Sequence, residues 1–98
     1  MKTMTIVRYK PKPEHYDLFL SDLISASGRS HYIASRDDEV LHVWVSKSID
    51  RLTDEQPGAL SWLDEHRHML QEYSEEEGHT RVITGFVEKE PIQQPSKA

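Results

Sequence analysis

Residues 29–47 read RSHYIASRDDEVLHVWVSK, two runs rich in β-branched and aromatic residues on either side of a polar connector. The first run, residues 29–36, and the second, residues 40–47, have the length and composition of strands. The connector of Asp37, Asp38 and Glu39 is short enough to join neighbouring antiparallel strands. The sequence therefore predicts a β-hairpin near the middle of the chain.

Upstream of the hairpin, residues 3–10 (TMTIVRYK) predict a first strand, which Pro11 and Pro13 end. Pro13 also suits the first turn of a helix. Apolar side chains follow at spacings of three and four, and residues 25–28 terminate the pattern. This apolar stripe consists of Tyr16, Phe19, Leu20, Leu23 and Ile24. We expect one amphipathic helix between the first strand and the hairpin.

Downstream of the hairpin, residues 59–73 (ALSWLDEHRHMLQEY) predict a second and longer helix. Thr53 and Gln56 match a capping box, and Pro57 with Gly58 directly after it favours a short helical turn before the main helix. The acidic run of residues 75–77 and Gly78 is expected to end this helix.

Residues 80–88 (TRVITGFVE) predict a last strand. The element order is then strand, helix, strand, strand, helix, strand, which is the ferredoxin-like βαββαβ arrangement with an antiparallel four-stranded sheet. We expect one such α+β domain over residues 1–89, followed by a flexible C-terminal tail over residues 90–98.

Both faces of the expected sheet carry apolar side chains, although its two helices cover one face. The third strand places Leu41, Val43 and Val45 opposite His42 and Trp44. The last strand places Val82, Thr84 and Phe86 opposite Ile83, Gly85 and Val87. A second apolar face is expected to be buried against another surface, and the sheet of an identical subunit is the simplest such surface. We therefore expect a homodimer with face-to-face sheets.

Composition narrows the classes of partner. The 98 residues include 12 Lys and Arg against 17 Asp and Glu, a net charge of −5, which argues against a nucleic-acid partner or an anionic membrane surface. No cysteine is present, which excludes disulfides and thiolate chemistry. The sequence shows no secretory signal. It also has no apolar run close to the length of about 18 residues that spans a bilayer. The expected location is therefore cytoplasmic.

Histidine and tryptophan supply the candidate chemistry. On a helical wheel His66 lies at the centre of the apolar stripe of the second helix, whereas His68 points to the opposite side. His66 is therefore either a satisfied core residue or a proton-transfer group that faces a cavity between helix and sheet. The other members of the stripe are Trp62, Leu63, Met69, Leu70 and Tyr73.

His42 and Trp44 share one face of the third strand. If this face meets the helices, both side chains help to line a pocket for a flat aromatic ligand; otherwise Trp44 is core and His42 bonds a neighbour. Arg8 and Tyr9 point to opposite faces, so at most one of them joins this pocket. Arg8 lies on an apolar face and needs a protein carboxylate or an anionic ligand group as partner. The candidate substrate-binding side chains are Trp44, Trp62, Tyr9, Met69 and Tyr73.

The sequence gives no sign of a metal or nucleotide site. His66 and His68 are two positions apart on the predicted helix, which prevents them from chelating one ion, and the HExxH spacing is absent. The GxGxxG, P-loop and GxSxG motifs are absent as well. We expect neither a metal nor another cofactor.

The chain resembles the dimeric α+β barrel superfamily and, within it, the antibiotic-biosynthesis-monooxygenase-like proteins. The resemblance covers residues 3–88 and rests on TIVRYKPKPEH (residues 5–15), HVWVSKSID (residues 42–50) and ALSWLDEHRHMLQEY (residues 59–73). It implies a cavity between sheet and helices, and either cofactor-free oxygenation of phenolic or quinone-forming substrates or haem degradation. Trp44 matches the strand aromatic of the family, and His66 is the nearest match to the helical histidine of the haem-degrading branch.

Three hypotheses follow. The first is a cofactor-independent monooxygenase in which His66 or His42 accepts a phenolic proton and Arg8 steadies negative charge. The second is a non-catalytic dimeric module that binds a small aromatic or haem-like ligand in the same pocket. The third is a protein with a collapsed pocket that acts through its dimer surface.

Overall fold

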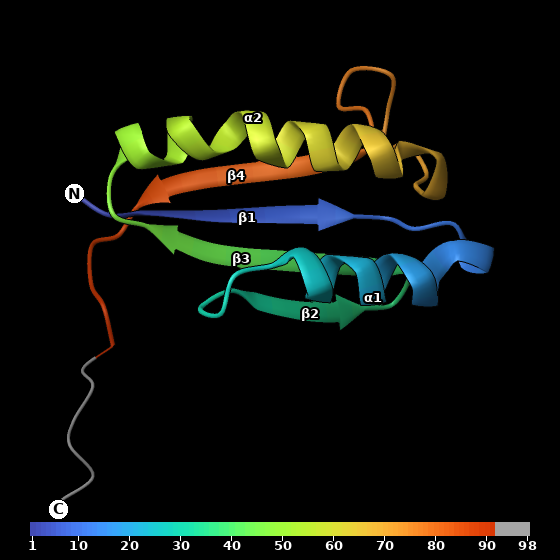
Figure 1. Ribbon diagram of the computed structural model, residues 1–98, viewed down its shortest axis with the longest axis horizontal. Helices are drawn as coiled ribbons and strands as arrows, with labels where there is room; N and C mark the ends of the chain where they lie inside the picture. Colours follow the sequence, from blue (N-terminus) through green and yellow to red (C-terminus); the bar gives the residue numbers. More distant parts are fainter. Residues whose placement is uncertain (92–98) are drawn as a thin grey trace, which may run out of the picture.

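The computed structural model of the protein describes residues 1–91 (Figure 1). Its elements follow the expected βαββαβ order, which confirms the ferredoxin-like α+β fold. One short 3₁₀ turn precedes the first helix, and another follows the second helix. The elements are β1 (Thr3–Tyr9), η1 (Pro13–His15), α1 (Tyr16–Ala26), β2 (Tyr32–Arg36), β3 (Glu39–Ser46), α2 (Ile49–His66), η2 (Arg67–Met69) and β4 (Thr80–Phe86). Of the expected tail at residues 90–98, residues 92–98 lie outside the described part of the chain.

The four strands form one antiparallel sheet in the order β2-β3-β1-β4. Strand β1 lies in the middle, where Val7 pairs with His42 of β3 and Val82 of β4. Its side chains alternate in exposure, so that every second residue from Thr3 to Tyr9 is buried. This alternation is the period of two that a sheet covered on one face imposes.

The hairpin turn is one residue shorter than the sequence suggested. Arg36 pairs with Glu39, so Asp37 and Asp38 alone connect β2 to β3. Asp37 has a φ of 53°, a left-handed conformation that aspartate tolerates better than most residues. A two-residue turn of this kind fixes the register of the hairpin.

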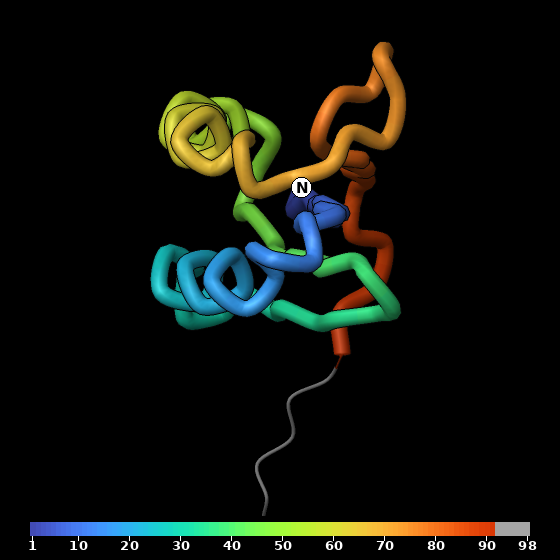
Figure 2. Tube along the Cα trace, turned by 90° about the vertical axis from the view of Figure 1, so that its right-hand side faces the viewer, coloured from blue at the N-terminus to red at the C-terminus, as the bar shows by residue number. Residues whose placement is uncertain are grey.

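Both helices cover the same face of the sheet (Figures 1 and 2). Phe19 and Leu23 of α1 are buried against the sheet, whereas Ile24 is 55% exposed and does not belong to the buried stripe, contrary to expectation. The main hydrophobic core consists of Val7, Tyr9, Phe19, Leu23, Val40, Leu63, Met69 and Leu70.

Helix α2 begins ten residues earlier than predicted. Its N-cap is Ser48, whose side chain accepts a hydrogen bond from the Arg51 amide, and the proposed capping box at Thr53 is wrong. Pro57 lies inside the helix, where it lacks the N–H that would bond to the Thr53 carbonyl. Because residues 53–61 are all exposed, solvent can satisfy that carbonyl, and the helix continues through the proline.

Helix α2 also ends seven residues earlier than predicted, at His66. The chain after it pairs with the segment that follows β1: the Lys12 amide donates to the Met69 carbonyl, and the Gln71 amide donates to the Lys10 carbonyl, both at 2.8 Å. This backbone pairing competes with helix formation and wins, so residues 70–73 are extended or irregular. Residues 75–77 form the turn between Ser74 and Gly78, which a backbone bridge joins.

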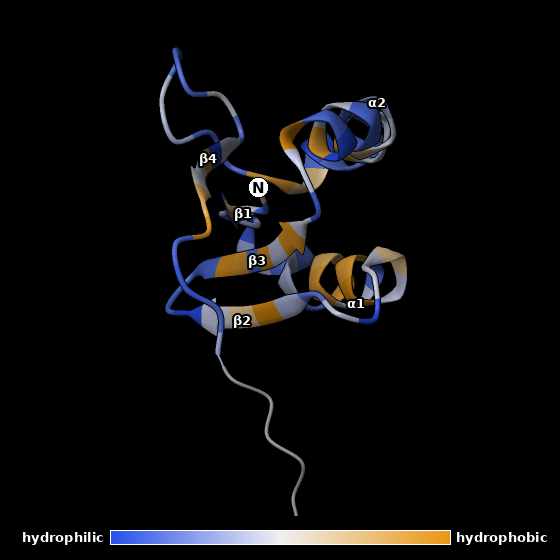
Figure 3. Cartoon of the chain, turned by 90° about the vertical axis from the view of Figure 1, so that its left-hand side faces the viewer, coloured by the Kyte–Doolittle hydropathy of each residue, from blue (hydrophilic) through white to orange (hydrophobic). Residues whose placement is uncertain are grey.

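Within residues 1–91, no helix lies over the face of the sheet opposite α1 and α2, here called the outer face (Figure 3). Met4 is 41% exposed, Val45 44% and Ile83 70%. Register places these three side chains beside one another, because Met4 pairs with Val45 while the neighbouring Ile6 pairs with Ile83. The expectation of two apolar sheet faces is therefore confirmed. Over residues 1–91, no helix is both long and apolar enough to cross a membrane.

Candidate functional site

A cleft of about 750 Å³ lies between the helices and the sheet. Its floor consists of helix-facing side chains of β1, β3 and β4, and α2 forms one wall. The volume is within the range of small-molecule sites, and most of the lining is apolar. Its lining residues include Tyr9, His31, His42, Trp44, Trp62 and Thr84.

Aromatic rings dominate this lining. Trp44 on β3 and Trp62 on α2 approach the cleft from the sheet and from the helix. Tyr9 meets Trp62 edge to face, with ring centroids 6.5 Å apart. Burial raises the pKa of Tyr9 to about 12, so its phenol stays protonated near neutral pH. A cleft with such walls suits a flat, unsaturated ligand.

The main polar feature of the cleft is a pair of histidines. Nδ1 of His31 and Nε2 of His42 share a hydrogen bond of 2.8 Å. The His31 ring also stacks on Trp44, with centroids 5.4 Å apart and planes 14° from parallel. His42 is 8% exposed, and its Nδ1 is buried without a hydrogen-bond partner in the described part of the chain.

Burial sets the charge of this pair. Burial and, to a smaller extent, the neighbouring His31 lower the pKa of His42 to about 4. Burial also lowers the pKa of His31, while the Glu55 carboxylate on α2 opposes that change. Both imidazoles are therefore neutral at pH 7, which leaves them able to accept a proton.

Two further polar contacts border the cleft. The hydroxyls of Thr5 on β1 and Thr84 on β4 lie 3.1 Å apart and share a hydrogen bond. Ser46 donates to the Glu55 carboxylate at 3.0 Å, which ties β3 to α2. These contacts position the cleft walls, and Glu55 also places a carboxylate among the lining residues, near the histidine pair.

His66 lies beside the cleft and not in it. Its Nδ1 donates to the Trp62 carbonyl at 2.8 Å, and its Nε2 is 3.3 Å from the Asp22 carboxylate of α1. The ring stacks on Trp62, with centroids 3.9 Å apart. His66 therefore joins the two helices and supports the cleft wall from behind, which corresponds to the satisfied core residue of the sequence analysis.

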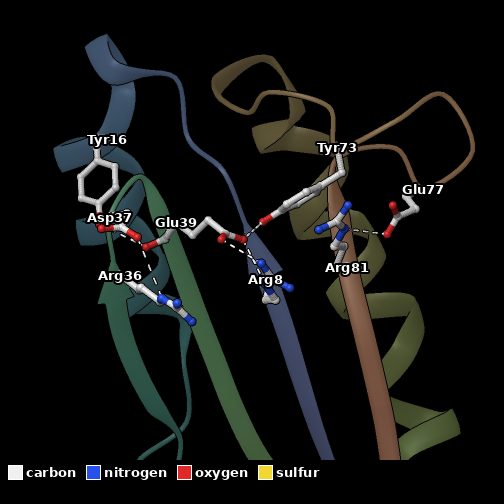
Figure 4. Close-up of polar contacts among 8 residues, drawn as sticks. All are labelled: Arg8, Tyr16, Arg36, Asp37, Glu39, Tyr73, Glu77 and Arg81. Atoms are coloured by element: carbon white, nitrogen blue, oxygen red, sulfur yellow. Dashed lines mark hydrogen bonds and ion pairs between the residues drawn. The ribbon is translucent and has the colours of Figure 1, made fainter.

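Arg8 lies on the outer face, so it cannot serve the cleft (Figure 4). Its guanidinium donates twice to the Glu39 carboxylate, at 3.0 and 2.8 Å. The Glu39 carboxylate is therefore the partner that an arginine on an apolar face requires. The hydrogen bonds from Arg8 and Tyr73 lower the pKa of Glu39 to about 2.

Tyr73 belongs to the same outer network and not to the cleft. It follows the end of α2, and its hydroxyl donates to Glu39. Arg81 of β4 lies over its ring, 4.6 Å from the centroid, and pairs with Glu77 (Figure 4). Burial and the bond to Glu39 raise the pKa of Tyr73. Met69, the remaining candidate, is 3% exposed and packs in the core without lining the cleft.

The structure thus brings together His42, Trp44, Trp62 and Tyr9, and it separates His66, Arg8, Met69 and Tyr73 from them. Sequence reasoning missed His31. The signal was the hairpin register: a two-residue turn at residues 37–38 pairs Ile33 with His42 and so directs His31 toward Trp44. In the described part of the chain, no group of three His, Cys, Asp or Glu side chains is placed to hold a metal ion.

The sequence matches no protein-family model and no curated protein. The fold is similar to the crystal structure of a NipSnap family protein of unknown function from Agrobacterium tumefaciens strain C58. The TM-score is 0.54 at 13% sequence identity, over 90% of this chain and 91% of that chain. The likeness therefore spans nearly all of both chains, and at this identity it shows the fold alone.

Proposed function

We propose that the cleft binds a small, flat phenolic or quinone-type molecule and that the protein acts on it as a cofactor-independent monooxygenase. The observation that carries this proposal is the neutral His31–His42 pair within an aromatic-lined cleft. The rings of Trp44 and Trp62 hold the ligand, and the imidazole pair accepts its phenolic proton.

The reaction balances with dioxygen as the oxidant. Proton transfer to the imidazole pair leaves a phenolate, which is electron-rich enough to reduce dioxygen. A phenol and one dioxygen then give a quinone and one water: one oxygen atom forms the new carbonyl, and the other leaves as water with two hydrogens of the substrate. The four electrons come from the substrate ring, so the chain itself supplies binding and proton transfer.

A second candidate function is binding of a small aromatic or haem-like ligand without turnover. One observation favours it: Arg8, the cation expected to steady negative charge, is paired with Glu39 on the other face of the sheet. The cleft then lacks the charge stabilisation that speeds an anionic reaction. Ligand-dependent stabilisation without oxygen consumption would decide for this candidate.

We further propose that the outer face contacts a second copy of the chain. The outer face exposes the apolar side chains of Met4, Val45 and Ile83, and their burial against another protein surface is favourable. The Glu39 carboxylate neutralises Arg8 at this face, so two copies can approach without burying an unpaired charge. A two-fold axis brings the same patch of both sheets together, which makes the contact self-complementary.

The binding proposal is tested with a panel of phenols and hydroquinones, with melting temperature and oxygen uptake as the two readouts. A matching ligand raises the melting temperature, and turnover consumes oxygen. Trp44→Leu and Trp62→Leu each reduce both effects. His68→Ala, an exposed histidine outside the cleft, serves as the control and leaves both unchanged. A panel that stabilises nothing would overturn the proposal.

A further inference from the structure

The two histidines of the cleft differ in what they can offer a ligand. The Nδ1 atom of His42 is buried, and its Nε2 is already bonded to His31. Within residues 1–91, Nε2 of His31 has no hydrogen-bond partner, and it is not among the buried unpaired atoms. His31 is therefore the member of the pair that presents a free ring nitrogen.

Three contacts hold the His31 ring in place. One face stacks on Trp44, and Nδ1 bonds to His42. Gly28 closes the third side, because a Cβ atom built at this position would lie 2.9 Å from Nε2 and 3.0 Å from Cδ2 of His31. The φ of Gly28 is not positive, so its backbone suits any residue and the need for glycine comes from the ring alone.

We propose, resting on the function proposed above, that His31 is the catalytic base of the cleft and that His42 is its positioning residue. In this arrangement Nδ1–H of His31 donates to Nε2 of His42. A neutral imidazole carries one N–H, so fixing it at Nδ1 leaves the lone pair of Nε2 free. The phenolic O–H of the ligand transfers its proton to that lone pair and becomes the phenolate.

Burial keeps the His42 ring neutral, and a neutral imidazole can accept a hydrogen bond at Nε2. In the proposed arrangement a neutral His42 accepts at Nε2 and therefore carries its own proton on Nδ1, the buried ring nitrogen that has no partner among the described residues. A hydrogen bond at one ring nitrogen generally decides which nitrogen of a histidine carries the proton, and His42 would do this for His31. The charged groups to consider are few: Glu55 of α2 acts on His31, and His31 itself acts on His42.

The tautomer is measured directly by ¹H–¹⁵N correlation spectroscopy of the imidazole nitrogens in the labelled full chain at pH 7.5. The expected result is a protonated Nδ1 and an unprotonated Nε2 for His31. In His42→Leu, which removes the acceptor, His31 reverts to a mixture of tautomers. In His42→Gln, which retains an acceptor, the Nδ1–H form is restored. A protonated Nε2 of His31 in the unaltered protein would overturn the proposal.

Gly28→Ala tests the position of the ring. The added methyl displaces the His31 ring, so the signals of His31 and of the Trp44 indole both shift. Gly85→Ala is the matched control, because a Cβ there meets nothing within 4 Å and the His31 signals stay unchanged. If Gly28→Ala also leaves these signals unchanged, Gly28 does not hold the ring as described.

Turnover separates this proposal from the one on which it rests. With a phenol that the unaltered protein oxidises, His31→Gln lowers kcat by about 100-fold or more while the ligand still binds. An unchanged kcat in His31→Gln overturns the role of His31 and leaves the proposed function standing. A protein that binds ligands of the panel but oxidises none of them refutes the base role together with the oxygenase.

Discussion

His42 makes the stability of the protein depend on pH. Its pKa is about 4 in the folded chain and near 6.5 when unfolded, so between these values the unfolded chain binds a proton that the folded chain does not. Acid therefore favours unfolding across this range. The free energy of unfolding is therefore unaffected by His42 titration above pH 6.5, and it falls by about 3 kcal/mol as the pH approaches 4.

Chemical denaturation at pH 7.5, 6 and 5 measures this loss in the free energy of unfolding. His42→Gln carries no titrating ring, so its stability should vary much less over the same range. Glu39 provides a separate check, because its lowered pKa of about 2 places its loss of stability below pH 4.5. Equal slopes for the two proteins between pH 6.5 and 5 would contradict a buried, neutral His42.

We expect the ion pair of Arg8 and Glu39 to contribute more to the free energy of unfolding than the more exposed ion pairs do. Glu39→Gln leaves Arg8 without its carboxylate and replaces one of the two oxygens that accept from the guanidinium by an amide nitrogen, which cannot accept. We expect a loss of about 1 kcal/mol in the free energy of unfolding, since the Arg8 side chain is 40% exposed and solvent screens part of the effect. Arg36→Gln, which removes the more exposed pair with Asp37, should change it by less than about 0.5 kcal/mol in the same urea titration.

At the scale of the elements, the strands were predictable and the second helix was not. Alternation and β-branched composition located all four strands within about three residues, because a period of two is visible in short segments. For α2, Pro57 and Gly58 suggested an interruption where the helix runs on, since their side of the helix is exposed. The extended chain after His66 depends on pairing with residues 10–12, which no local pattern reveals.

The same elements explain which site residues were predictable. His42, Trp44 and Tyr9 were placed by strand alternation, which survives any small error in strand ends. Tyr73 was assigned to a helix face that does not exist, because α2 ends at His66. His31 lies one residue before β2 and needed the exact turn length for its placement. Long-range pairing and turn geometry therefore set the limit of sequence reasoning here.

Gly58 weakens α2 without serving its packing. A Cβ at this position meets nothing within 4 Å, and the residue lies in an exposed helix interior. Gly58→Ala should raise the free energy of unfolding by about 0.5–1 kcal/mol through helix propensity. Gly78→Ala should lower it instead, because Gly78 has a φ of +71° that alanine adopts only with strain. The two changes are compared by thermal or urea unfolding, and a destabilising Gly58→Ala would contradict a continuous α2.

At the level of the whole molecule, the exposed apolar residues of the outer face support the proposed contact with a second copy of the chain. Ile83→Lys puts a charge into the proposed contact and should convert a dimer into a monomer in sedimentation velocity at micromolar concentration. Leu18→Lys changes another exposed apolar residue, which lies on α1 and away from the outer face, and should leave the dimer intact. A monomeric unaltered protein would refute the contact between sheets.

A titration followed by NMR tests whether a ligand binds in the cleft. A phenol of the panel is added to the ¹⁵N-labelled chain, and the indole signals of Trp44 and Trp62 are recorded with the ring signals of His31. If the ligand binds between these side chains, all three sets of signals shift together and saturate at one ligand per chain. Signals that stay in place, or shifts confined to outer-face residues such as Met4 and Ile83, would contradict it.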